Sequence, residues 1–235
     1  MKDPNPHLRF AVLAADTALF TIKDGALHIR LINVDRPPHF KNVPGLPGGL
    51  LHPNETAEAA AVRHLEEKSG IDTKKIHIEQ LYTFSHVDRD PRGRVVAVAY
   101  LALVAWETLS DIEQQSDKGA MWVPLKSANP SNKLGARKLA YDHDEILAVA
   151  AQRLRARVHY STLISKLVPH EFTLTDLEKA YECVIGTGPD KRNFRKKILK
   201  LGILKELSKK KSGGRFRPAK LYSFASSKVS TMEVL

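Results

Sequence analysis

The sequence is poor in cysteine, in aromatic side chains and in long apolar runs. Cys183 is the single cysteine of the 235 residues, so no disulfide can form within the chain and a reducing, cytoplasmic location is expected. Its apolar neighbours favour a packed side chain over a reactive thiol. No stretch reaches the roughly 18 apolar residues of a membrane span. The N-terminus lacks the apolar core of a signal peptide. We therefore expect no membrane partner.

Positive charge is concentrated in the last third of the chain. The net charge is +11, yet residues 1–155 hold 20 Lys and Arg against 19 Asp and Glu. Residues 156–235 hold 17 against 7. This asymmetry predicts two domains, 1–156 and 157–235, and favours a polyanion as partner of the second. An acidic membrane surface, or a basic surface that only aids solubility, is the alternative on charge alone.

The first domain is expected to combine strands and helices. Two apolar runs flank Asp24-Gly25, which is typical of a tight β-hairpin turn. A Pro-rich loop should follow, then a helix over residues 56–69 that ends at Gly70. Further strands are predicted on both sides of a turn at 90–93 and over MWVPL, and a long helix over 142–160. This order predicts an α+β mixed sheet with helices packed on it.

Residues 49–71 resemble the Nudix box. That motif runs Gly, five residues, Glu, seven residues, then Arg-Glu-apolar-X-Glu-Glu-X-Gly-apolar. The positions in register are Gly49, Glu55, Arg63, Leu65, Glu67, Gly70 and Ile71. The resemblance implies a Nudix-type fold and a pocket for a nucleoside diphosphate linked to another group. In such a box, carboxylates on one helical face hold Mg²⁺, which activates water.

Two of the motif's carboxylates are missing. His64 and Lys68 occupy positions where the motif has glutamate. A histidine gives a hard cation no oxygen ligand, and a lysine places positive charge where a dication would sit. We therefore predict no catalytic or metal site, doubtful Mg²⁺ binding, and loss of hydrolysis. For Lys68, a side chain turned outward to solvent is favoured over contact with a phosphate.

A second cluster, FSHVDRDPRGR, resembles the region after the box in Nudix proteins that handle ADP-ribose and related NAD metabolites. Arginine suits diphosphate and ribose recognition, and an aromatic ring can stack on adenine. A polar hairpin turn with a local salt bridge is the alternative. The residues predicted to bind ligand are Arg36, Gly48, Gly49, Arg63, Glu67, Phe84, Asp88, Arg89 and Tyr100.

The basic tail has the outline of a winged helix-turn-helix: three short helical periods followed by two strands around a Gly-Gly turn. In its third helix, which Pro189 should open, Phe194, Ile198 and Leu201 form an apolar stripe. Polar and basic residues occupy the other side, as in a helix that reads a DNA groove. The residues predicted to bind DNA are Lys191, Arg192, Asn193, Arg195, Lys196, Lys200, Arg215 and Arg217. The last ten residues are expected to be loose.

As a whole, the sequence is similar to the Nudix-related transcriptional regulator family (NrtR-like). This resemblance implies a repressor of NAD synthesis or salvage genes that binds palindromic operators as a homodimer. No cofactor would be required, and ADP-ribose or a related metabolite would act as effector. One alternative is an ADP-ribose pyrophosphatase with a basic nucleic-acid-binding appendage. Another is an RNA-binding Nudix protein, although Phe216 and Tyr222 alone make no stacking platform.

Overall fold

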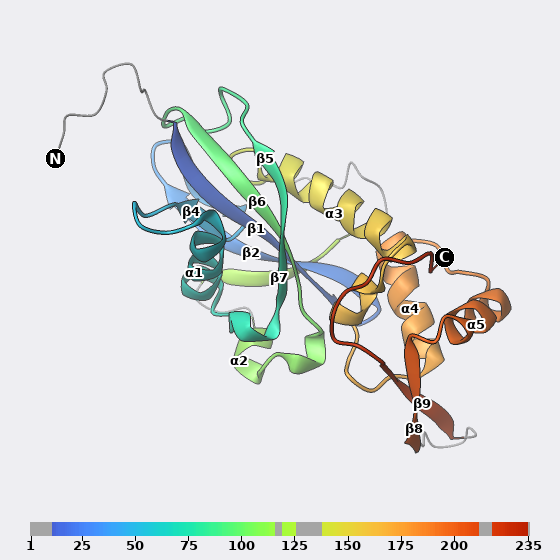
Figure 1. Cartoon of the computed structure of the whole chain (residues 1–235). Coiled ribbons are helices and arrows are strands. Elements are labelled where there is room, and N and C mark those ends of the chain that lie inside the picture. Colours follow the sequence, from blue (N-terminus) through green and yellow to red (C-terminus); the bar gives the residue numbers. More distant parts are fainter. Residues whose placement is uncertain (1–10, 116–118, 126–137, 212–217, 235) are drawn as a thin grey trace.

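The computed structural model describes residues 11–115, 119–125, 138–211 and 218–234 (Figure 1). The first part is a mixed sheet with strand order β3-β2-β1-β6-β5, in which β4 also pairs with β1 and β7 with β2. Its strands are β1 (Val12–Lys23), β2 (Ala26–Arg36), β3 (Phe40–Gly45), β4 (Gly48–Leu50), β5 (His77–Phe84), β6 (Val95–Leu103) and β7 (Ala120–Pro124). Strands β1 and β6 run parallel, and the other pairs are antiparallel.

The predicted hairpin between β1 and β2 is confirmed. Asp24 and Gly25 both have positive φ angles, 49° and 73°, as a tight hairpin turn requires. From the sequence, the Pro-rich segment that follows is expected to be a loop. In the structure it instead contains β3 and β4. Strand β3 pairs with β2 at a bulge between Val34 and Arg36, and β4 pairs with β1. Strand β3 leads into the segment before α1 that carries Gly48 and Gly49, which we call the box loop.

Helices α1 (Ala57–Ser69) and α3 (His143–His159) contact opposite faces of the sheet (Figure 1). The small side chains of Ala15, Ala60 and Ala61 allow α1 to lie close to β1. Buried residues of α3, such as Ile146 and Leu154, pack on the other face. Helix α1 spans almost the range predicted from sequence. Thr56 caps its first turn, and Gly70, with φ of 70°, ends it.

Short elements complete the first part of the chain. They are the 3₁₀ turns η1 (Thr73–Lys75) and η2 (Trp106–Thr108) and the helix α2 (Asp111–Gln114). None of the described helices is both long and apolar enough to cross a membrane.

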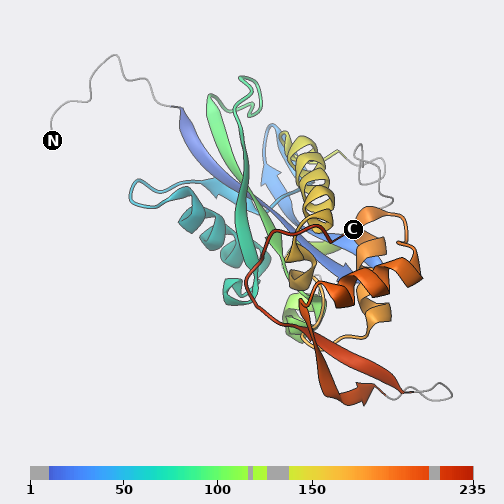
Figure 2. The ribbon, with the colours of Figure 1, turned by 45° about the vertical axis from the view of Figure 1, so that its right-hand side comes forward.

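The basic tail forms helices α4 (Leu174–Ile185) and α5 (Lys191–Lys200) and a hairpin of β8 (Leu204–Lys211) and β9 (Ala219–Phe224). This is the winged helix arrangement expected from sequence, and the hairpin extends away from the sheet (Figure 2). The first of the three expected helices is instead a 3₁₀ helix, η3 (Thr162–Lys166). Pro189 was expected to open the third helix. In the structure Asp190 caps α5, so the helix begins at Lys191. The Gly-Gly turn lies outside the described residues.

One continuous apolar core joins the two parts of the chain. It runs from Ala14 in β1 through α3 to Tyr181 in α4 and Ile198 in α5. Cys183 bridges them as well, since its Sγ donates to the Gly25 carbonyl at 3.0 Å, and burial raises the pKa of this thiol. A half-buried, packed cysteine matches the sequence expectation. The sheet and the winged helix therefore pack as neighbours rather than as independent bodies on a linker.

The last residues are not loose, contrary to the sequence expectation. Met232 and Val234 donate backbone hydrogen bonds to the carbonyls of Tyr160 and His159, both at 2.8 Å. Val234 is buried, and Ser230 accepts from the Thr162 backbone at 2.9 Å. The chain up to Val234 is thus fastened to the junction between α3 and η3, and this order comes from backbone pairing that no sequence periodicity reveals.

Candidate functional site

The loop that enters α1 depends on glycines at close contacts. A Cβ at Gly48 would lie against the carboxylate of Asp16 and 2.6 Å from the Ala15 carbonyl. A Cβ at Gly49 would lie 2.7 Å from the His64 ring. Such distances leave no room for a side chain. The loop backbone therefore runs directly against β1 and α1, as the resemblance to the box implies.

Arg63 braces this loop with both remaining carboxylates of the box. Its guanidinium forms a bidentate ion pair with Glu55, pairs with Glu67 at 3.3 Å, and donates to the Leu50 carbonyl. The bond from Arg63 is the main cause that lowers the pKa of Glu55, to about 2. Arg63 and Glu67 lie four residues apart on α1, so this ion pair joins successive turns of the helix. The stronger partner is Glu55, which was not expected in that role.

His64 is buried and turned toward the same loop. Its Nε2 lies 3.0 Å from the Leu50 carbonyl, which can only accept, so Nε2 carries the ring proton. Nδ1 then accepts from Arg63 at 3.3 Å. Burial first, then the charges of Lys68 and Arg63, lower the pKa of His64, so the ring is neutral near pH 7. Neither ring nitrogen is free to bind a cation.

Lys68 also points inward, so the expected outward, solvated side chain is wrong. Its Nζ donates to the carbonyl of Gly48. Burial first, and then the neighbouring charge of Arg36, lower the pKa of this ammonium group. The helix register explains the direction, because position 68 lies one turn after His64 on the face of α1 that covers the loop.

These contacts argue against a magnesium site of the Nudix kind. Glu55 and Glu67 are both held by Arg63, and positions 64 and 68 supply an imidazole and an ammonium group. Among the described residues, no three His, Cys, Asp or Glu side chains are placed to hold a metal ion. The donor set present here therefore does not fit Mg²⁺, which prefers carboxylate and water oxygens.

A buried charged network lies beside the loop. Arg89 donates to Asp142 at 2.6 and 2.8 Å and to Asp16 at 3.2 Å. His143 accepts from the Leu46 backbone at Nδ1, so its proton lies on Nε2, 3.7 Å from Asp16. Burial alone would raise the pKa of Asp16, but His143 and Arg89 hold it below its ordinary value. The network fixes the start of α3 to β1 and to the β5–β6 loop.

A cavity of about 970 Å³ opens between the box loop, α1 and this network. Its size lies at the upper end of the roughly 300–1,000 Å³ that is usual for small-molecule sites. Six of the nine residues predicted to bind ligand line it: Arg36, Gly48, Gly49, Arg63, Glu67 and Arg89. We call this cavity the box pocket.

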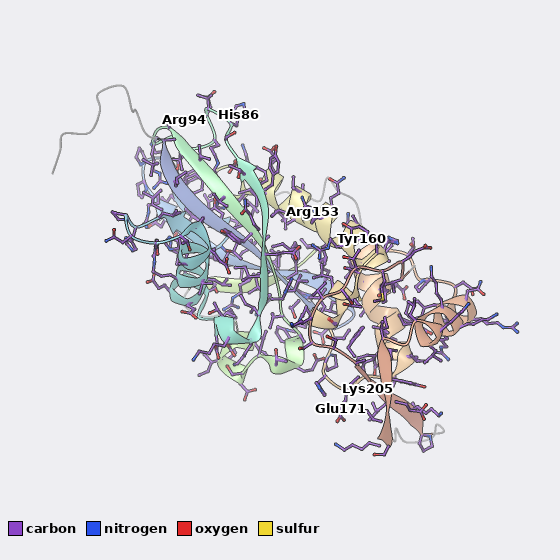
Figure 3. The ribbon with its side chains drawn as sticks, viewed as in Figure 1. His86, Arg94, Arg153, Tyr160, Glu171 and Lys205 are labelled. Carbon is purple, nitrogen blue, oxygen red and sulfur yellow. The ribbon has the colours of Figure 1, made fainter. Side chains whose placement is uncertain are left out.

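The other three predicted ligand residues do not line the box pocket. Phe84 is buried in the main core, and Tyr100 is buried among alanines beneath α1. Neither ring has a free face for adenine, which corrects the stacking expectation. Asp88 is exposed at the tip of the β5–β6 loop. That tip also carries His86 and Arg94, and Arg94 donates to the His86 carbonyl at 3.2 Å (Figure 3).

Sequence reasoning missed several residues of the pocket wall. Tyr141 lies beside His143, and the Arg92 guanidinium lies over its ring at 5.3 Å. Arg30, although almost fully buried, donates to the carbonyls of Ser69 and Gln115. An aromatic residue just before the Asp142 cap of α3 is the one sequence signal that marks Tyr141. Nothing local marks Arg30, which reaches the pocket from a central strand.

The second candidate site is the outer face of α5. The exposed residues there are Lys191, Arg192, Asn193, Lys196 and Lys200, and Phe194 and Ile198 are buried beneath them. None of these four cations has an acidic partner within the part of the chain that the structure describes. A helix that is buried on one face and basic on the other matches the geometry of a groove-binding helix. We call these five residues the α5 face.

Arg195 does not belong to the α5 face. Its guanidinium pairs with the buried Glu178 of α4 at 2.5 and 3.2 Å and donates to Thr175 at 3.1 Å. These bonds fix α5 against α4, and the contact of Arg195 with DNA stays a prediction. The predicted DNA residues Arg215 and Arg217 lie outside the described residues.

Comparison with known proteins agrees with this architecture. Residues 13–148 match the model of the NUDIX domain, and residues 164–224 match that of the NrtR DNA-binding winged helix domain. The "ADPR responsive transcriptional repressor NtrR" of Acinetobacter baylyi is 35% identical over 216 residues, which cover 91% of this chain and 82% of the relative.

Two solved structures from Shewanella oneidensis are also similar. NrtR complexed with a 27mer DNA has a TM-score of 0.77 and 31% identity, covering 90% of this chain and 93% of the other. The NUDIX domain of the same protein complexed with ADP ribose has a TM-score of 0.51 and 29% identity, covering 65% and 94%. Fold and sites thus define an α+β protein with a Nudix domain and a winged helix domain. The chain belongs to the NrtR family.

Proposed function

We propose that this protein is a transcriptional repressor that binds double-stranded operator DNA through the α5 face and the wing. In this proposal, the box pocket binds ADP-ribose or a closely related nucleotide, and this ligand changes the affinity for DNA. The observation that carries the proposal is a nucleotide-sized pocket lined by several arginines, with no metal-binding cluster among the described residues, on the same core as a basic helix.

The box pocket supports the effector half of the proposal. Arg36, Arg63 and Arg89 line it with planar donor groups, which suit diphosphate and ribose oxygens. Glycines 48 and 49 expose the loop backbone to a ligand. The related Nudix domain solved with ADP ribose makes that nucleotide the first to test.

The tail supports the DNA half. In α5, six of ten residues are Lys or Arg and none is acidic. Arginine and asparagine can read base edges in the major groove, and the lysines suit phosphates. The related protein solved with a 27mer DNA favours DNA over RNA as partner.

We further propose that the Nudix domain has lost hydrolysis. A water nucleophile needs a metal or a free carboxylate nearby, and Glu55 and Glu67 are both engaged by Arg63. Incubation with ADP-ribose and Mg²⁺ should leave the nucleotide intact. AMP release at an enzymatic rate would instead support a pyrophosphatase.

The decisive experiment is fluorescence anisotropy of a labelled duplex taken from upstream of NAD synthesis or salvage genes. The protein is titrated at fixed salt with and without ADP-ribose, and a scrambled duplex serves as control. We expect tighter binding to the upstream duplex, with an affinity that changes when ADP-ribose is added. Equal binding to both duplexes would contradict the repressor proposal, and indifference to ADP-ribose would contradict the effector.

Family membership supports three further parts of the proposal. The regulated genes are those of NAD synthesis or salvage, the protein acts in the cytoplasm, and it binds a palindromic operator as a homodimer. A dimer places two α5 helices about one helical turn of DNA apart, or a multiple of it. The domain limits are 1–156 and 157–235. Sedimentation of the protein with and without duplex tests the dimer, and a protein-to-duplex ratio of one would contradict it.

A further inference from the structure

Lys68 occupies a position where the Nudix box has a metal-binding glutamate. The side chain does not turn away, because its Nζ donates to the carbonyl of Gly48 in the box loop and lines the box pocket. A positive charge thus lies at the place that a metal-dependent box reserves for a cation.

The charge of Lys68 lacks a contacting counterion. No carboxylate of the described residues lies within 4.0 Å of its Nζ; the hydrogen-bond partner is a neutral carbonyl. Asp16 and Glu67 act on it only at longer range, and Arg36 and Arg63 repel it. An ammonium group that is partly removed from water and has no paired anion favours an anionic ligand.

Two neighbouring arginines of the pocket, unlike Lys68, contact carboxylates. Arg63 is already paired with Glu55 and Glu67, and Arg89 with Asp16 and Asp142. Lys68 has three donors, of which the Gly48 carbonyl takes one. It is therefore a cation of the pocket with donors available for phosphate oxygens.

We propose that the Lys68 ammonium group takes the place of the divalent cation at the diphosphate, so that the box pocket binds ADP-ribose without a metal ion. This inference rests on the proposed function, since it assumes that ADP-ribose is the effector. A fixed ammonium group neutralises phosphate charge but cannot activate water as a metal ion does. Binding is thereby separated from hydrolysis, and the affinity for effector is independent of cellular Mg²⁺.

Calorimetric titration of the full chain with ADP-ribose, in EDTA and in Mg²⁺, tests this assignment. The variants are Lys68→Met, Lys68→Arg and the matched control Lys74→Met, whose lysine is exposed on η1 and outside the pocket. We expect equal wild-type affinity in both buffers and, for Lys68→Met, a loss of about 10- to 100-fold, as for a charge-assisted hydrogen bond. Lys68→Arg should recover most of the loss, and Lys74→Met should match the wild type.

A second ligand separates a phosphate contact from a role in loop structure. Adenosine lacks the diphosphate, so its binding should be unchanged in Lys68→Met if the lysine acts on phosphate. Equal losses for adenosine and ADP-ribose, or a wild-type affinity that collapses in EDTA, would overturn the proposal. The double variant His64→Glu with Lys68→Glu should bind ADP-ribose only in Mg²⁺, and binding in EDTA as tight as the wild type would also overturn it.

Binding by the wild type separates the identity of the effector from the role of Lys68. If the wild type binds no ADP-ribose in either buffer, both the proposed effector and the proposed role of Lys68 are refuted. If the wild type binds while Lys68→Met binds equally well, the effector stands and the role of Lys68 alone is refuted.

Discussion

Glu113 is a buried carboxylate that stabilises the fold through charge-assisted hydrogen bonds. It accepts from the backbone of Ser110 at 2.7 Å and of Asp72 at 2.8 Å, and it pairs with Lys75 at 2.9 Å. Burial alone would raise its pKa. The Ser110 hydroxyl, which donates to Glu113 at 2.6 Å, and these other donors lower it from 4.5 to about 2. The lowered pKa means that folding favours the ionised form.

A pH prediction follows from this shift. The stabilisation is complete above pH 4.5 and is lost as the pH falls toward 2, where the folded state also takes up the proton. Glu113→Gln should therefore lower the free energy of unfolding by about 3 kcal/mol at pH 7, and by much less near pH 2. Urea unfolding at both values measures this, with the exposed Glu107→Gln as control. A pH-independent loss would assign Glu113 a role in packing alone.

Gly49 is required because its surroundings leave no room for a side chain, and not because of its backbone angle. A Cβ there would meet the buried His64 ring at 2.7 Å and the Lys68 Nζ at 3.0 Å. Gly49→Ala should cost about 1–3 kcal/mol of stability by overpacking, and it should weaken ADP-ribose binding. Gly188→Ala is the matched control, because its nearest neighbour is the Glu182 side chain at an ordinary 3.5 Å. Equal unfolding curves for both variants would refute the crowding at Gly49.

Among the structural elements, helices with caps and apolar stripes were predictable from sequence. Helices α1 and α3 lie within one residue of their expected ranges, whereas α5 ends before the predicted stripe residue Leu201. Strands β3 and β4 were not predicted, because they are short, contain proline or glycine and owe their pairing to β2 and β1. The order of the last residues likewise comes from long-range backbone pairing.

The ligand site was predictable only in part, for a related reason. The box fixes glycines and Arg63 by local spacing, so these residues were placed correctly in the pocket. Whether Phe84 or Tyr100 faces a ligand depends on which side of a strand is covered by a helix. Both sides of this sheet are covered, so alternation along β5 and β6 does not mark a solvent-facing aromatic residue.

Helix α5 carries two kinds of arginine, and they should respond differently to mutation. Arg192 is exposed without a partner among the described residues, whereas Arg195 is bound to Glu178 and Thr175. Arg192→Ala should weaken operator binding by about 1–3 kcal/mol with an unchanged Tm. Arg195→Ala should lower the Tm, because it leaves the buried Glu178 carboxylate unpaired. Anisotropy and thermal unfolding of both variants check this, and the reverse pattern would exchange their roles.

The box pocket and the α5 face lie on different parts of one molecule, and α3 connects them. Its first residue, His143, lines the pocket. Its last turns lie beside α4 (Figure 1). Along its length Arg153 donates to the Leu81 carbonyl of β5, and Arg155 to the Val184 carbonyl of α4. A rigid helix bonded to both parts is a physical route for coupling between two sites.

The link that a pocket ligand can disturb is the ion pair of Arg89 with Asp142. Arg89 lines the pocket, and Asp142 holds it at the start of α3. An anionic ligand near Arg89 competes with Asp142 for the same donors and so biases the position of the helix.

If α3 carries the signal, Asp142→Asn should reduce the ADP-ribose-dependent change in operator affinity at least several-fold, while affinity without ligand stays near the wild-type value. The matched control is Glu145→Gln, which removes an exposed carboxylate one turn further along the same helix. Anisotropy with and without saturating ADP-ribose measures the coupling, and calorimetry confirms that ligand is still bound. Full coupling in Asp142→Asn would show that the signal reaches α5 by another path.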